Sequence, residues 1–161
     1  MKFLLALFVL CFSFARLVSA EPYKEEVLTL AQAKKLVSGC ESYARENKLA
    51  PLSMAVYDAA GNIKLFLRQD GAKLLSTDFA RIKGRTAAVS GLATSELAAI
   101  EYENKGKPLG IGDMDGVTIV QGGVAVASDS GQHLGGFGVS GAPAVDDEAC
   151  GVAGVDEMLG K

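Results

Sequence analysis

Apolar residues recur at helical spacing in four stretches of the chain. In the first stretch, Thr29 and Gln32 have the spacing of a capping box, which predicts a helix over residues 30–47. Capping residues at Ser76 and Thr94 predict that two further helices begin there. The same apolar spacing predicts a last helix over residues 143–159.

Shorter apolar runs without helical spacing predict strands. Residues 52–57 and 63–69 flank a turn sequence and form one hairpin, and a second hairpin joins a run ending at Ala127 to residues 132–141. A further short strand over residues 117–120 gives five strands in all. Strands joined by tight turns run antiparallel, so the expected fold class is α+β: an antiparallel five-stranded sheet covered by helices on both faces.

The last predicted strand is rich in glycine. Because glycine has no Cβ, another backbone or a flat ligand can approach this strand closely, and we expect it to form the floor of a pocket. Residues 136–141 also match the G-x-G-x-x-G pattern of dinucleotide-binding folds. Those folds need a second parallel strand after the helix, and the short remainder of the chain has room for the helix alone, so we interpret the match as coincidental.

The amino terminus has the pattern of a secretory signal. Lys2 precedes an apolar run over residues 3–14, and Val18 and Ala20 occupy the small-residue positions before the expected cleavage site. This apolar run is too short to span a bilayer. We therefore expect residues 1–20 to be removed and residues 21–161 to form a single domain, secreted or periplasmic, without a membrane span.

The net charge and the cysteines limit the classes of function that are expected for this protein. Removal of residues 1–20 takes away Lys2 and Arg16, which leaves 14 basic against 19 acidic residues and a net charge of −5. This acidic balance argues against a nucleic-acid partner. The mature chain keeps Cys40 and Cys150, which either form a disulfide after export or remain two small buried residues.

Arg68, Asp70 and Lys83 are the candidate ligand-binding side chains. Arg68 and Asp70 lie where a strand ends, and Lys83 lies on the helix that follows. Two basic groups converging on the glycine-rich hairpin could hold the carboxylates of a small acid or the propionates of a porphyrin. An ordinary surface ion pair with Asp70 explains the same residues equally well. The predicted pocket floor adds Gly123, Gly136 and Gly138.

His133, the sole histidine, is the candidate metal ligand. It lies near the start of the last strand, where it serves either as an axial ligand to iron or as an ordinary histidine near a turn. Other conceivable donors to haem iron are Tyr57, Met54 and Cys40, but their sequence context is more typical of core residues.

Five segments in a fixed order carry a family resemblance. They are residues 29–33, 68–72, 80–87, 121–124, and 135–141 with the acidic residues 146–148 after them. Together they resemble the GlcG/HbpS family, which also includes the C-terminal domain of PduO-type proteins. The resemblance covers nearly all of residues 21–161.

The resemblance implies a profilin-like antiparallel sheet between helices, assembly into homo-oligomers, and binding of haem or iron, with haem degradation in some members. Two features depart from the family pattern. Gly84 stands where an alanine usually follows the lysine, and the first helix lacks the histidine with which a PduO-type domain would reach haem iron.

The leading hypothesis is an exported, oligomeric haem-binding or iron-binding protein. One alternative is an enzyme or accessory factor that acts on a small hydroxy acid or related catabolite, and another is an oligomeric scaffold without catalysis. No set of residues dictates a reaction, so the sequence does not choose among these hypotheses. We favour a protein that is not an enzyme and keep haem degradation as an alternative that the resemblance implies. We expect replacement of Arg68 or Lys83 by alanine to weaken haem binding by roughly tenfold.

Overall fold

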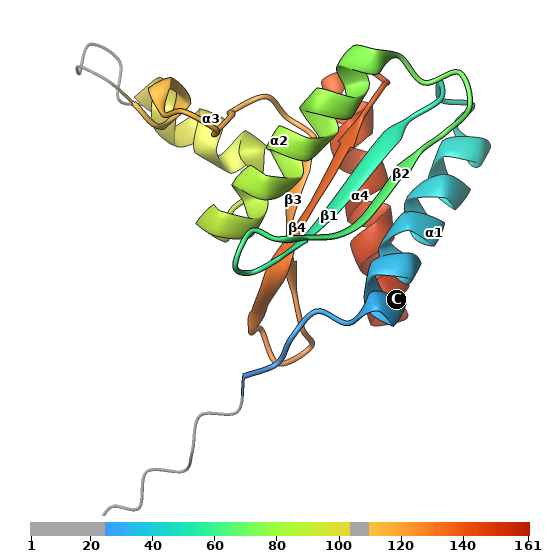
Figure 1. Ribbon diagram of the computed structural model, residues 1–161, viewed down its shortest axis with the longest axis horizontal. Coiled ribbons are helices and arrows are strands. Elements are labelled where there is room, and N and C mark those ends of the chain that lie inside the picture. The colour runs from blue at the N-terminus through green and yellow to red at the C-terminus, as the bar shows by residue number, and fades with distance from the viewer. Residues whose placement is uncertain (1–24, 104–109) are drawn as a thin grey trace, which may run out of the picture.

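The computed structural model describes residues 25–103 and 110–161, so the predicted signal sequence over residues 1–20 lies outside the described part. Four strands form an antiparallel sheet in the order β2-β1-β4-β3 (Figure 1). β1 (Ser53–Asp58) and β2 (Ile63–Arg68) form the first predicted hairpin, and β3 (Gly123–Ala127) and β4 (His133–Ser140) form the second. The pairing of β1 with β4 joins the two hairpins into one sheet.

The α+β class and the antiparallel sheet are confirmed, but the predicted number of five strands is wrong for the described residues. The segment 117–120 is not a strand, because its backbone turns toward a helix. The Thr118 N–H donates to the Thr86 hydroxyl at 3.1 Å. Gly122 then has a φ of 121°, which interrupts the extended conformation just before β3 begins.

Helices cover both faces of the sheet (Figure 1). α1 (Leu30–Glu46) and α4 (Ala144–Leu159) pack on the face where Val56, Phe137 and Val139 join the main core. α2 (Leu74–Ser90) packs on the opposite face, over β1, β3 and β4. α3 (Thr94–Glu103) contacts α2 and β3, and a short 3-10 turn, η1 (Ile111–Asp113), follows it.

The ends of the helices agree with the sequence in one case and differ in another. The capping box of α1 is confirmed, since the Gln32 N–H donates to the Thr29 hydroxyl and the Thr29 N–H donates to the Gln32 side chain. α2 begins at Leu74, two residues before the predicted Ser76 cap. The Ser76 hydroxyl instead donates to the Lys73 carbonyl at 2.6 Å and lies 2.9 Å from the buried Ser53 hydroxyl. Its side chain therefore makes hydrogen bonds inside the protein.

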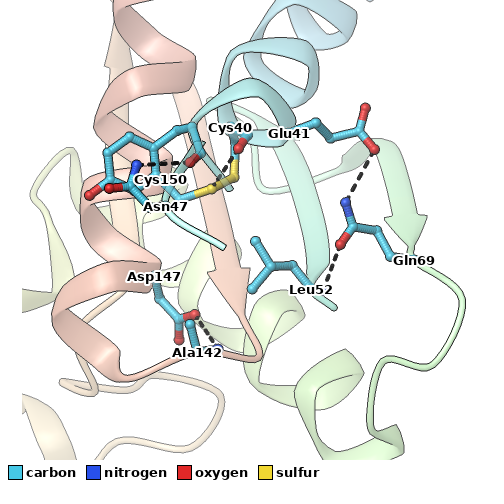
Figure 2. The surroundings of a disulfide bond; sticks show 9 residues. Cys40, Glu41, Asn47, Leu52, Gln69, Ala142, Asp147 and Cys150 are labelled. Atoms are coloured by element: carbon cyan, nitrogen blue, oxygen red, sulfur yellow. Dashed lines mark hydrogen bonds between the residues drawn. A yellow bond between two sulfur atoms is a disulfide. The ribbon is translucent and has the colours of Figure 1, made fainter. Parts of the chain in front are cut away.

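A disulfide between Cys40 and Cys150 joins α1 to α4 (Figure 2). The two Cα atoms are only 4.5 Å apart, and both cysteines are fully buried. Glycines allow this close approach, because a Cβ on Gly39 would lie 2.7 Å from the Ala153 carbonyl and one on Gly154 would lie 2.3 Å from the Leu36 carbonyl. Among the described residues, the helices are all too short or too polar to cross a membrane.

Candidate functional site

The glycines of β4 lie under α2 rather than under an open pocket. A Cβ on Gly136 would come within 2.3 Å of the Ala88 nitrogen, and one on Gly138 within 2.1 Å of the Ala80 carbonyl. Gly84, the departure from the family pattern, allows the same contact from the helix side, since its own Cβ would lie 2.8 Å from the Gly138 nitrogen. The expected pocket floor is therefore covered by the protein's own helix.

Gly123 has the same environment. A Cβ on this residue would lie 2.5 Å from the Lys83 carbonyl and 2.8 Å from the Thr94 side chain. Its N–H donates to the Thr94 hydroxyl at 3.0 Å. The three predicted glycines thus bring α2 and α3 onto the sheet, and a role for them in direct ligand contact stays a prediction.

Lys83 lies inside the protein, in a buried ion pair. Its ammonium donates to Asp147 Oδ2 at 2.9 Å and to the Val139 carbonyl at 3.1 Å, and both side chains are 2% exposed. The other Asp147 oxygen accepts the Ala142 N–H at 3.0 Å (Figure 2). The pair therefore links α2 to the first turn of α4 at the end of β4.

The surroundings of this pair explain its chemistry. Burial raises the pKa of the Asp147 carboxyl above its usual value, while the hydrogen bond and the charge of Lys83 act in the opposite direction. Gly122 leaves room for both groups, because a Cβ there would lie 2.7 Å from the Lys83 ammonium and 2.9 Å from the Asp147 Cβ. For Lys83 to bind a ligand's carboxylate, that carboxylate would have to compete with Asp147.

Arg68 and Asp70 lie apart from this pair, at the exposed end of β2. Arg68 is opposite Ser53, and Phe66 is opposite Ala55, so the side chains of Arg68 and Phe66 share the sheet face on which α2 packs. Because α2 covers β1, β3 and β4 rather than β2, this part of the face is open. The structure does not bring Arg68 and Lys83 together as a pair of cations.

His133 is half-buried at the start of β4, beside the end of α2. Its Nε2 lies 2.6 Å from the Ala88 carbonyl, and because a carbonyl oxygen only accepts, Nε2 carries the proton and donates. This bond satisfies one of the last carbonyls of the helix. Among the described residues, no cluster of three or more histidine, cysteine or acidic side chains could hold a metal ion.

A pocket of about 410 Å³ opens beside α2, and we call it the α2 pocket. Its volume lies within the range of small-molecule sites. Apolar side chains form its walls, two arginines on α2 add positive charge, and Tyr57 enters from β1. The lining residues are Tyr57, Leu75, Asp78, Phe79, Arg81, Ile82, Arg85 and Gly116.

Arg85 connects this pocket to the loop before β3. Its Nη1 donates to the Gly116 carbonyl at 3.3 Å. Arg81 and Arg85 are four residues apart, so they lie on the same side of the helix. That spacing was visible in the sequence, but the contribution of Tyr57 was not, because only the folded structure shows that the end of β1 lies beside the pocket-lining side chains of α2.

The protein-family model described as haem degrading protein HbpS-like matches residues 28–156. A crystal structure of HbpS is 32% identical to this chain, with 88% of this chain and 96% of that chain covered and a TM-score of 0.74.

A double mutant of Streptomyces reticuli HbpS is 34% identical, with 83% of this chain and 88% of that chain covered and a TM-score of 0.71. A PduOC complex with haem is 23% identical over 82% of this chain and 95% of its own, with a TM-score of 0.67, and shares the fold. No curated protein sequence matches the chain. The match over residues 28–156, together with more than 30% identity to HbpS, shows that the chain belongs to the HbpS-like family of haem-degrading proteins.

Proposed function

We propose that this protein binds haem and that the α2 pocket is its binding site. The observation that carries the proposal is the composition of that pocket, which combines apolar walls from Leu75, Phe79 and Ile82 with two arginines. A porphyrin has the matching chemistry, a flat apolar ring with two carboxylates at one edge. Guanidinium groups bind carboxylates through charge-assisted hydrogen bonds and also stack on flat rings.

The pocket is also open enough to admit haem, and it contains a side chain of a type that binds haem iron. Leu75 is 64% exposed, so the pocket is a surface groove that a flat ligand can enter from the side. Tyr57 supplies an oxygen of a type that serves as an axial ligand in other haem proteins. Bound haem would supply iron redox chemistry, while the chain itself would orient the ring and hold its carboxylates.

The family supports the same ligand. The chain belongs to a family described as haem-degrading, and the PduOC structure that shares its fold contains haem. The location of the site rests on the geometry of this chain alone. It differs from the arrangement expected from the sequence, which combined Arg68 and Lys83 with the glycines of the last strand.

Haemin titration followed by absorption tests the proposal. We expect the wild type to give a saturable Soret change. Replacing both Arg81 and Arg85 by alanine should weaken haemin binding by roughly tenfold or more, because the propionates lose their charge-assisted contacts. Arg68→Ala is the matched control, since it removes an exposed arginine from β2, outside the pocket.

The outcomes separate the two placements of the site. A larger loss for Arg68→Ala than for the double variant would move the site to the open face of β2. Saturable binding of a small hydroxy acid, with no response to haemin, would instead favour the small-acid hypothesis for the same pocket.

We also propose that the protein is exported and self-associates. The buried Cys40–Cys150 disulfide supports export, because such bonds persist in oxidising compartments. Leu74 and Leu75 support self-association, since these neighbouring leucines on α2 are 74% and 64% exposed. An exported protein that still begins at Met1, or a monomer by light scattering at micromolar concentration, would contradict the respective part of this proposal.

A further inference from the structure

The sequence suggested four side chains as donors to haem iron, namely Cys40, Met54, Tyr57 and His133, and the structure places them in different environments. Cys40 is bonded to Cys150. Met54 is fully buried in the core that α1 and α4 form with the sheet. The Nε2 of His133 donates to the Ala88 carbonyl. Tyr57 alone among these four lines the α2 pocket.

The position of Tyr57 in the sheet explains why it reaches this pocket. It lies opposite Gly136 of β4 and packs in a small cluster with Ala55, Ala80 and Ala88, between the sheet and α2. The residue is 6% exposed, so its ring is held firmly by its neighbours. A flexible loop residue would not offer such a fixed donor.

The Tyr57 hydroxyl is unused by the protein. Among the described residues it has no hydrogen-bond partner. The hydroxyl is also not fully buried. In the described part of the chain, the one side-chain oxygen or nitrogen that is both fully buried and without a partner belongs to Glu148. Tyr57 lines the α2 pocket together with apolar side chains and two arginines, so its unpartnered hydroxyl is a polar group available to a ligand there.

We propose that Tyr57 is the axial ligand through which this protein holds ferric haem, an inference that rests on haem binding in the α2 pocket. The phenol loses its proton to solvent as its oxygen bonds to the iron, the iron stays ferric, and no electron is transferred. Arg81 and Arg85 line the same pocket and supply positive charge beside the iron-bound oxygen and the propionates. Tyrosine serves as the axial ligand in this way in catalase.

Tyr57→Phe tests the inference, because it removes the donor oxygen and keeps the ring that fills the cluster. With haemin added, we expect the phenolate-to-iron charge-transfer absorption of the wild type to disappear, the Soret band to shift, and the affinity to fall by roughly tenfold. Tyr102→Phe is the matched control, since Tyr102 is 63% exposed on α3 and lies outside the pocket. Its spectrum should equal that of the wild type.

A second variant makes the test independent of lost stability. Tyr57→His places a nitrogen donor at the same position and should replace the phenolate spectrum by a histidine-type spectrum. Identical spectra for wild type and Tyr57→Phe, or a spectral change in His133→Ala but not in Tyr57→Phe, would overturn the assignment of Tyr57 while leaving haem binding intact. No Soret change in the wild type would instead overturn the proposed function and the ligand with it.

Discussion

Replacing Lys83 by methionine is expected to destabilise the fold by about 3–5 kcal/mol, the usual loss when one partner of a buried ion pair is removed. Lys83 and Asp147 are each 2% exposed, and among the described residues the Asp147 carboxyl would keep only the Ala142 N–H as a hydrogen-bond donor. The free energy of unfolding in urea measures the loss. Lys64→Met is the matched control, because Lys64 is exposed on β2 and should change stability by less than about 0.5 kcal/mol.

The pH dependence of this loss has a definite sign. Burial raises the pKa of Asp147, and removal of Lys83 takes away the interactions that lower it. A carboxyl with a raised pKa in the folded state binds protons more tightly than in the unfolded state, so its contribution to stability falls as the pH rises through that pKa. The loss caused by Lys83→Met should therefore be smaller near pH 4.5 than at pH 7.

A second change separates a buried charge from lost packing. Adding Asp147→Leu to Lys83→Met removes the unpaired carboxyl, and we expect this double variant to regain a large part of the lost stability. If Lys83→Met cost less than about 1 kcal/mol, or if the double variant were the less stable of the two, the ion pair would not hold α2 to α4 as described.

Loss of the disulfide is expected to cost about 2–5 kcal/mol, the range found for native disulfides in small secreted domains. Cys40 and Cys150 are 110 residues apart in sequence, so the bond restricts most of the unfolded chain. The double variant Cys40→Ala/Cys150→Ala removes it without leaving a free thiol or burying a hydroxyl. Its free energy of unfolding should lie below that of the oxidised wild type by this amount.

Reductant provides the control for the disulfide. Unfolding the wild type in dithiothreitol should lower its stability toward that of the alanine double variant, whose own stability should not respond. Equal stabilities for the oxidised wild type and the double variant would show that α1 and α4 are held by packing alone.

Most of the fold could be predicted from the sequence because its periodic signals are strong. The helical spacing after Thr29 and the turn sequences between paired apolar runs gave α1 and both hairpins close to their observed limits. The false strand over residues 117–120 had the same local apolar pattern as a real one. Tertiary contacts keep this segment from forming a strand, because Thr118 bonds to Thr86 and Gly122 packs against Lys83.

The candidate site was less predictable from the sequence. A glycine-rich pattern indicates that another group can approach a strand closely, but it does not identify that group. The glycines of β4 indicated close approach, and the partner is the backbone of α2. Lys83 lies at helical spacing from Ala80 and Ala87 on the buried side of α2, and that spacing was the signal of its burial. Tyr57 had the context of a core residue, and its opening to the α2 pocket depends on contacts distant in sequence.

The most direct test of the central claim, that haem binds in the α2 pocket, is the location of iron in crystals of the protein loaded with haemin. Anomalous scattering at the iron absorption edge gives this position without reference to any spectrum. We predict one iron peak per chain in the α2 pocket, within bonding distance of Tyr57 Oη, with the propionates toward Arg81 and Arg85. An iron peak beside His133, or over Arg68 on the open face of β2, would contradict that prediction.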